Sequence, residues 1–150
     1  MNRNRENRIC WNRGWHFYEE YTPALQEKET VGFPEGTEVE LPHTAAVTPL
    51  HYFDEGIYQK HCAYRKCFVP EKDWEGKRIF LNIEAAGHSA RVYLNGILLT
   101  EHFCGYTAFR AELTAGIRQG VENVLLIEVD SRESQDLPPF GRAIDYMTFG

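Results

Sequence analysis

Acidic side chains that lie close together in the sequence are the first residues that could do chemistry, because neighbouring carboxyl groups can act as general acid and general base. The 150-residue chain has 22 acidic residues, so close pairs are easy to find. The candidates are Glu19 with Glu20, Asp54 with Glu55, and Glu71 with Asp73. All three pairs fall in expected loops or strand ends, where charged side chains are usually solvated. We therefore interpret them as surface residues and expect no catalytic pair.

Histidine and cysteine are the other residue types with chemical potential, as metal ligands or as a nucleophile with its base. The chain contains His16, His43, His51, His61, His88, His102, Cys10, Cys62, Cys67 and Cys104. No two histidines have the spacing of a ligand pair, and the cysteines form neither a Cys-x-x-Cys pair nor a zinc pattern. We expect no metal site and no cofactor. A disulfide framework is not expected in a chain long enough to bury a core.

Several of these side chains have an ordinary structural interpretation. Cys67 and Cys104 lie in apolar segments, where thiols usually pack as small buried hydrophobic groups. His43 follows a Leu-Pro pair and is expected to order a loop through a hydrogen bond. His88 and His102 flank an expected hairpin and are assigned to the surface or to a sheet edge.

The formal net charge of −6 argues against a nucleic-acid partner, because phosphate binding requires a basic surface. The basic run Arg3, Arg5 and Arg8 falls in an expected solvated lead-in that covers residues 1–13. No apolar run approaches the length of a membrane span, so no membrane contact is expected. The charged start also lacks the apolar segment of a signal peptide. A native start at Met1 would therefore place the protein in the cytoplasm.

Alternating apolar and polar residues predict a series of short strands. The three Trp, eight Tyr and nine Phe agree with this, because aromatic residues favour pleated, half-buried surfaces. The expected strands cover residues 15–18, 37–41, 64–69, 77–84, 89–94, 97–103, 108–113 and 123–130. Asn95-Gly96 predicts a two-residue hairpin turn, and Thr114 is expected to cap a short helical turn that reaches Ile117. The pattern predicts an all-β sandwich of antiparallel strands with at most short helical turns.

Two of these strands indicate which side chains face the core. In residues 123–130, the apolar side chains of Leu125, Ile127 and Val129 alternate with other residues and are assigned to the core face. In residues 77–84, Phe80 is an apolar residue on the polar face, and we expect it to pack under a loop.

Short motifs follow one another along the chain in a characteristic order. They are Leu41-Pro42-His43, Tyr64-Arg65-Lys66, Trp74-Glu75-Gly76-Lys77, residues 92–96, Gly105-Tyr106, residues 129–132, and Ile144-Asp145 ahead of Phe149-Gly150. In this order and at these spacings, the chain from about Gly14 onward resembles the N-terminal domain of glycoside hydrolase family 2, which includes β-galactosidases and β-glucuronidases.

The resemblance implies a jelly-roll β-sandwich of the galactose-binding type, as one domain over residues 1–150. It also implies a parent enzyme that hydrolyses O-glycosidic bonds of β-galactosides or β-glucuronides with two Glu residues in a TIM barrel. Because a TIM barrel needs about 250 residues, we expect a non-catalytic domain with no catalytic residue. The implied partners are immunoglobulin-like and TIM-barrel domains of the same polypeptide and the carbohydrate substrate at their shared active-site mouth. Contacts between copies in a homo-oligomer are a further option.

Residues 131–150 contain Pro138-Pro139 and apolar side chains without a periodic face. Such a tail suggests a surface that another domain covers, and we expect the chain to be truncated there. Arg132, Arg142 and Asp145 lie in the segment that reaches the barrel in related enzymes. The resemblance implies that they contact the sugar in the complete enzyme, and salt bridges between domains are the alternative. Ser131 stands where many relatives have Asn.

Sugar binding by the domain alone would need aromatic platforms with polar groups at the edge of the sugar ring. Platforms could come from Trp11, Trp15, Tyr52, Phe53 and Tyr58. Aromatic residues in a sandwich nevertheless belong to the core more often than to a binding surface. A stand-alone carbohydrate-binding or adhesion module, and a structural spacer without a ligand, therefore remain alternatives.

Overall fold

The computed structural model describes residues 8–27, 35–47, 50, 55–57, 59–132, 134 and 136. Within these residues the chain forms eight strands and three single-turn 3-10 helices. The strands are β1 (Trp15–Tyr18), β2 (Thr37–Val39), β3 (His61–Phe68), β4 (Phe80–Ile83), β5 (Ser89–Leu94), β6 (Ile97–His102), β7 (Phe109–Glu112) and β8 (Asn123–Asp130). The 3-10 helices are η1 (Pro23–Gln26), η2 (Glu55–Ile57) and η3 (Lys72–Trp74).

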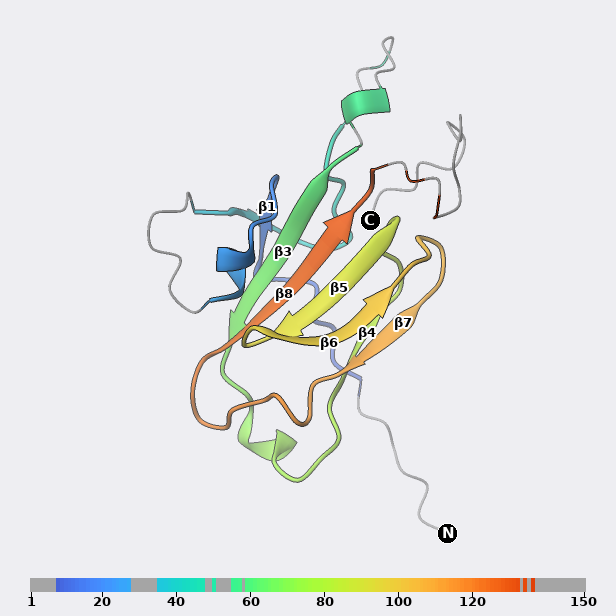
Figure 1. Cartoon of the computed structure of the whole chain (residues 1–150). Helices are drawn as coiled ribbons and strands as arrows, with labels where there is room; N and C mark the ends of the chain where they lie inside the picture. The colour runs from blue at the N-terminus through green and yellow to red at the C-terminus, as the bar shows by residue number, and fades with distance from the viewer. Residues whose placement is uncertain are drawn as a thin grey trace.

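The strands form two antiparallel sheets that enclose a common core (Figure 1). The larger sheet has the order β2-β1-β3-β8-β5-β6, and β4 pairs with β7 in a two-stranded sheet. The central strands β3 and β8 pair along their whole lengths, from His61 opposite Asp130 to Phe68 opposite Asn123. We call the two ends of this pair the Asp130 end and the Asn123 end of the sandwich.

Strand β8 is buried on both faces over most of its length. The residues on its core face are those that the alternation predicts, Leu125, Ile127 and Val129. On the outer face of the sheet, Leu126 packs with Leu25 of η1 in a second, smaller apolar cluster. Because η1 and its neighbours cover this outer face, β8 lies in the interior although it belongs to a sheet with one exposed side.

A pair of asparagines holds the turn between β5 and β6. Asn95 and Gly96 have positive φ angles of 52° and 80°, which confirms the expected hairpin. The Asn95 amide donates to Oδ1 of Asn123 at 2.8 Å. The fully buried Asn123 amide also accepts the N–H of Arg118 at 2.8 Å and donates to the carbonyls of Arg118 and Val121, both at 2.9 Å. Asn123 therefore joins the hairpin to the loop before β8.

Lys66 of β3 is a charged side chain in the interior, only 8% exposed. Its Nζ lies 5.0 Å from the ring centroid of Trp11 and 5.7 Å from that of Trp15, and it donates to the carbonyl of Arg13. Burial lowers the pKa of its ammonium group. A Cβ on Gly14, which has φ +72°, would lie 3.2 Å from Nζ. These contacts hold residues 11–15 against the sheet, so Trp11 packs although it falls within the expected lead-in.

Two strand boundaries and the contacts of two side chains differ from expectation. Strand β3 begins at residue 61 rather than 64, and β4 begins at Phe80 rather than at residue 77. The expected turn that reaches Ile117 is present, since the N–H groups of Gly116 and Ile117 donate to the carbonyl of Leu113 at 3.0 and 3.1 Å. Thr114 does not cap this turn, because its Oγ1 accepts the N–H of Ile79 at 2.9 Å. Phe80 does not pack under a loop. Its ring lies beside two guanidinium groups, 4.9 Å from that of Arg78 and 5.6 Å from that of Arg110.

The expectation that Cys67 is buried is wrong. The even-numbered residues of β3 face the core, so Cys67 points to the outer face and is exposed. Cys62 is the buried thiol of this strand, and burial raises its pKa to about 11. Cys104 is partly exposed.

The fold class expected from the sequence is confirmed: the structure is an all-β, antiparallel jelly-roll sandwich with single helical turns. Strand β8 provides the central surface on which both the core and η1 pack. In the described part of the chain, no helix is long and apolar enough to cross a membrane.

We expect Asn123→Ala to lower the free energy of unfolding by about 2–4 kcal/mol, because it leaves several buried backbone and side-chain groups without partners. Urea denaturation of the 150-residue chain would measure the change. Asn82→Ala is the matched control, since Asn82 is exposed on β4 and accepts a single hydrogen bond from Arg110. Its effect should stay within about 0.5 kcal/mol. Equal losses would contradict the role given to Asn123.

Candidate functional site at the Asp130 end of strand β8

Glu128 is a buried carboxylate on the outer face of the sheet, with 4% of its surface exposed. Its Oε1 contacts Nε2 of His61 at 2.8 Å and accepts a hydrogen bond from Arg91 Nη1 at 3.2 Å. Its Oε2 accepts a hydrogen bond from the Tyr93 hydroxyl at 2.9 Å. His61 lies on β3 and the other two partners lie on β5, the strands on either side of β8. A carboxylate buried in a sheet must be satisfied in this way, because an unpaired buried charge is strongly unfavourable.

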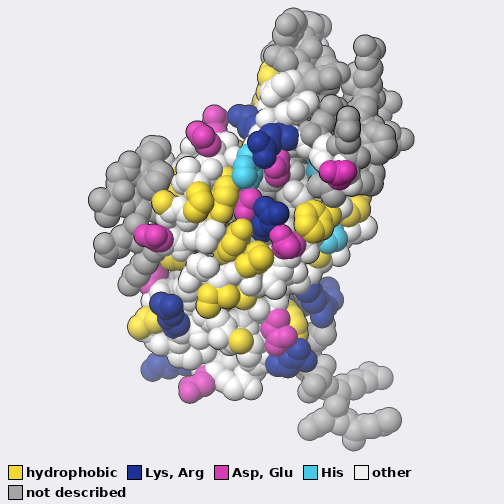
Figure 2. Space-filling view, in the orientation of Figure 1, with side chains coloured by type: hydrophobic (Ala, Val, Ile, Leu, Met, Phe, Trp, Pro, Cys, Tyr) yellow, Lys and Arg dark blue, Asp and Glu magenta, His cyan; other side chains and the backbone are white. Residues whose placement is uncertain are grey.

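The neighbours of Glu128 extend the charged network to the solvent. Arg91 also donates to Glu101 of β6 through Nε at 2.6 Å, and both side chains are about 40% exposed. Burial and then the hydrogen bond to Glu128 raise the pKa of the Tyr93 phenol far above its ordinary value. We call His61, Arg91, Tyr93, Glu101 and Glu128 the Glu128 cluster. Figure 2 shows basic, acidic and histidine side chains close together on this face, among apolar ones.

Arg132 and Asp130 form an ion pair where β8 ends. Asp130 Oδ1 accepts from Nε of Arg132 at 2.8 Å, and Oδ2 accepts from Nη2 at 2.6 Å. Burial alone would raise the pKa of Asp130, but the hydrogen bonds and the charge of Arg132 outweigh burial and hold this pKa below its ordinary value. The planar guanidinium fork of Arg132 is thus engaged by a carboxylate of its own domain.

Ser131 closes the central strand pair at the same end. Its backbone N–H and its hydroxyl both donate to the carbonyl of Lys60, at 2.9 and 3.1 Å, and its Oγ accepts the N–H of Lys60 at 3.0 Å. These bonds extend the pairing of β3 and β8 by one residue beyond His61 and Asp130. Ser131 therefore fixes the position at which the chain leaves the sheet.

Of the three expected substrate-binding residues, the structure places Arg132 at this end of β8. Arg142 and Asp145 lie outside the described residues, so their expected role is untested. The sequence pattern does not single out Glu128, because an acidic residue in an alternating strand suggests a solvent-facing position. Its three partners are 35, 37 and 67 residues away in the sequence, so no local pattern could have revealed them.

The other candidates occupy ordinary structural positions. Trp15 belongs to the core, with 1% exposed, so it cannot be a sugar platform, whereas Tyr52, Phe53 and Tyr58 lie outside the described residues. Two of the acidic pairs lie on the surface. Glu19 Oε2 lies 3.6 Å from Lys60 Nζ, and Asp73 Oδ2 lies 3.1 Å from Lys77 Nζ. Asp54, from the third pair, lies outside the described residues.

The histidines follow a similar pattern. His43 Nδ1 lies 3.1 Å from the Tyr64 hydroxyl, the loop-ordering hydrogen bond that was expected, and burial lowers the pKa of His43. His102, on the edge strand β6, stacks on Phe109 with ring centroids 4.3 Å apart. The N–H of His88 donates to the carbonyl of Asp130 at 3.0 Å. No group of three or more His, Cys, Asp or Glu among the described residues could hold a metal ion.

Comparison with known proteins places the chain in a family. No family model matches it. A β-galactosidase of Thermoanaerobacter pseudethanolicus is 42% identical over 113 residues, which are 75% of this chain and 15% of that protein. A β-galactosidase of Thermoanaerobacterium thermosulfurigenes is 35% identical over 140 residues, 93% of this chain and 19% of that protein. The crystal structure of a Bacteroides uniformis β-glucuronidase matches 87% of this chain and 15% of its own, with a TM-score of 0.72 and 30% identity.

The chain belongs to glycoside hydrolase family 2. It matches the N-terminal domain of these enzymes, as the order of its motifs predicts. This family 2 domain spans less than a fifth of the length of the curated relatives named above. The Glu128 cluster and the Arg132–Asp130 pair thus lie in a chain that matches a small part of much larger enzymes.

We expect Glu128→Gln to lower the free energy of unfolding of this family 2 domain by about 1–3 kcal/mol, because the amide cannot satisfy three donors as a carboxylate does. Glu101→Gln is the matched control in the same cluster. Since Glu101 is 39% exposed, its loss should cost less than about 1 kcal/mol. Urea denaturation of both variants would distinguish a buried anchor from an ordinary surface pair, and equal effects would contradict the assignment.

We expect Arg132→Ala to raise the pKa of Asp130, which NMR titration of the side-chain carboxyl carbon would measure. The folded pKa is depressed, so the pair stabilises the domain above the unfolded value of about 3.9. This contribution is lost as the pH falls through the folded pKa, and the difference between wild type and Arg132→Ala should shrink there. Arg118→Ala is the control, because Arg118 is exposed and lies in the loop before β8. An unchanged Asp130 titration in Arg132→Ala would refute the ion pair.

Proposed function

We propose that the chain serves as the non-catalytic N-terminal domain of a family 2 glycoside hydrolase that cleaves β-galactosides or β-glucuronides. The observation that supports this most directly is the match to two curated β-galactosidases over only 15% and 19% of their lengths. Structural matches to a β-glucuronidase and to a putative β-galactosidase, with TM-scores of 0.72 and 0.75, support the same proposal.

The state of the carboxyl groups supports a non-catalytic role. Retaining glycosidases need two carboxyl groups about 5–5.5 Å apart, one of them with a raised pKa. Arg132 holds the pKa of Asp130 below its ordinary value, and a hydrogen bond from Arg78 does the same for Glu112. Glu128 is only 4% exposed, and both of its oxygens already have protein partners. These groups are suited to ion pairs, and the hydrolytic residues would lie in other domains.

The Asp130 end is the proposed contact with the rest of the enzyme. Residues 131–150 would pack on immunoglobulin-like and TIM-barrel domains of the same polypeptide, with the substrate at the shared mouth. Arg142 and Asp145 are the residues we propose to contact the sugar directly. Arg132 already binds Asp130 through two N–H groups, so we propose that it fixes the direction of the chain and offers only its remaining N–H groups to a partner.

The 150-residue chain should therefore release no chromophore from p-nitrophenyl β-galactoside or p-nitrophenyl β-glucuronide. A polypeptide that continues through the following domains should hydrolyse at least one of them. In that longer protein, Asp145→Ala should lower kcat/KM, whereas Asp136→Ala, a nearby exposed carboxylate, should have little effect. Hydrolysis that co-purifies with the 150-residue chain at constant specific activity would refute the proposal.

A further inference from the structure

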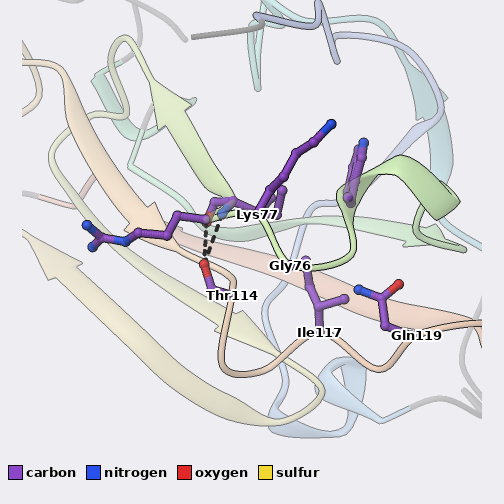
Figure 3. A pocket seen from close by; sticks show the side chains of 8 residues that line it. Gly76, Lys77, Thr114, Ile117 and Gln119 are labelled. Atoms are coloured by element: carbon purple, nitrogen blue, oxygen red, sulfur yellow. Dashed lines mark hydrogen bonds between the residues drawn. The ribbon is translucent and has the colours of Figure 1, made fainter. Parts of the chain in front are cut away.

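A small hollow lies at the Asn123 end of the sandwich, opposite to the end that holds Arg132. Three segments line it: the turn after η3, the first residues before β4, and the loop before β8. Its volume is about 240 Å³, and its lining residues are Trp74, Gly76, Lys77, Arg78, Ile79, Thr114, Ile117 and Gln119. Figure 3 shows Gly76 and Lys77 across from Thr114, Ile117 and Gln119.

The apolar part of the hollow is rigid. Trp74 is partly exposed, and its ring packs against Trp11 and Phe68 with centroids 5.9 and 6.1 Å apart. Ile79 and Ile117 are half-buried and also pack on the core. A partly exposed indole that the core holds in place can contact an apolar ligand with little loss of conformational freedom.

Gly76 lines the hollow without a side chain. It has a φ angle of +73°, and a Cβ built there would meet nothing within 4 Å. The positive φ explains why glycine is favoured, because side chains rarely adopt this conformation. Gly76 and Trp74 both line the hollow.

Some polar groups of the hollow are already held by hydrogen bonds within the protein, and others can bind a ligand. Thr114 is committed to Ile79, and Arg78 donates to both carboxylate oxygens of Glu112 at 3.1 and 2.9 Å. Lys77 makes only an exposed pair with Asp73, a kind of contact that contributes little. The exposed side-chain amide of Gln119 makes no hydrogen bond to any residue that the structure describes. A donor–acceptor amide and an ammonium group are thus available at the rim.

We propose that this hollow binds a single pyranose ring of a carbohydrate. The aromatic and aliphatic lining would take the apolar C–H face of the sugar, and the Gln119 amide and the Lys77 ammonium would bind hydroxyl groups at its edge. The volume is below the about 300–1,000 Å³ of sites for larger organic ligands, which suits one ring. Because Arg78 already binds the Glu112 carboxylate and the Gln119 amide is uncharged, a neutral hydroxylated ligand fits better than a bare anion.

The test uses the three indole N–H signals of the 150-residue chain in two-dimensional ¹H–¹⁵N NMR spectra. The probes are methyl β-galactopyranoside, methyl β-glucopyranoside and methyl β-glucuronide. We expect the Trp74 signal, assigned with Trp74→Phe, to shift and saturate at millimolar concentrations of at least one probe. The Trp15 signal should not move, because its Nε1 donates to the carbonyl of Trp11 in the buried core. The absence of a saturable shift at Trp74 with all three probes would overturn the proposal.

Two variants locate the binding in the hollow. Gln119→Ala and Lys77→Met should each weaken binding about threefold to tenfold, the usual effect of removing one hydrogen bond. Lys72→Met is the matched control, because Lys72 is an exposed lysine of η3 that does not line the hollow. Equal affinity in all three variants would also overturn the proposal. The readout involves no hydrolysis, so either result leaves the proposed role in the enzyme to its own test.

Discussion

The burial of β8 on both faces is the constraint on which the rest of the structure depends. Two neighbouring strands occupy its edges, the core covers one face, and η1 with its aromatic neighbours covers much of the other. Any polar group on such a strand must find all its partners inside the protein. The two polar residues that β8 buries, Asn123 and Glu128, do so in different ways. Their partners determine how each end of the sandwich is built.

The two ends of β8 consequently have different properties. At its start, Asn123 binds mainly backbone groups, and this holds the loop that forms one wall of the hollow. Towards its end, Glu128 binds side chains, and these lead outward through Arg91 to charged groups on the surface. One end is thus held mainly by bonds to backbone groups, and the other presents a network of charges beside the point where the chain leaves the sheet.

The features that depend on local pattern could be predicted from the sequence. The Asn95-Gly96 turn, the core face of β8 and the approximate positions of the strands along the chain follow from periodicity and turn chemistry. Features that depend on residues distant in sequence could not. Thr114 resembles a helix cap until Ile79, 35 residues away, takes its hydroxyl as a partner. Glu128 has the sequence pattern of a surface residue, and its burial depends on partners from the neighbouring strands β3 and β5. The family resemblance identified the domain, but Arg142 and Asp145 remain predictions.

The Ser131–Lys60 contact has a mechanical consequence. Three hydrogen bonds tie the exit of β8 to the residue before β3, so a load applied to the chain beyond Ser131 reaches both central strands together. Along the strand axis, that load acts on the β8 hydrogen bonds to β3 and β5 in shear, and many of them must break at once. Movement of a domain attached beyond this point would therefore turn the sandwich as a rigid body before it could peel a strand from the sheet.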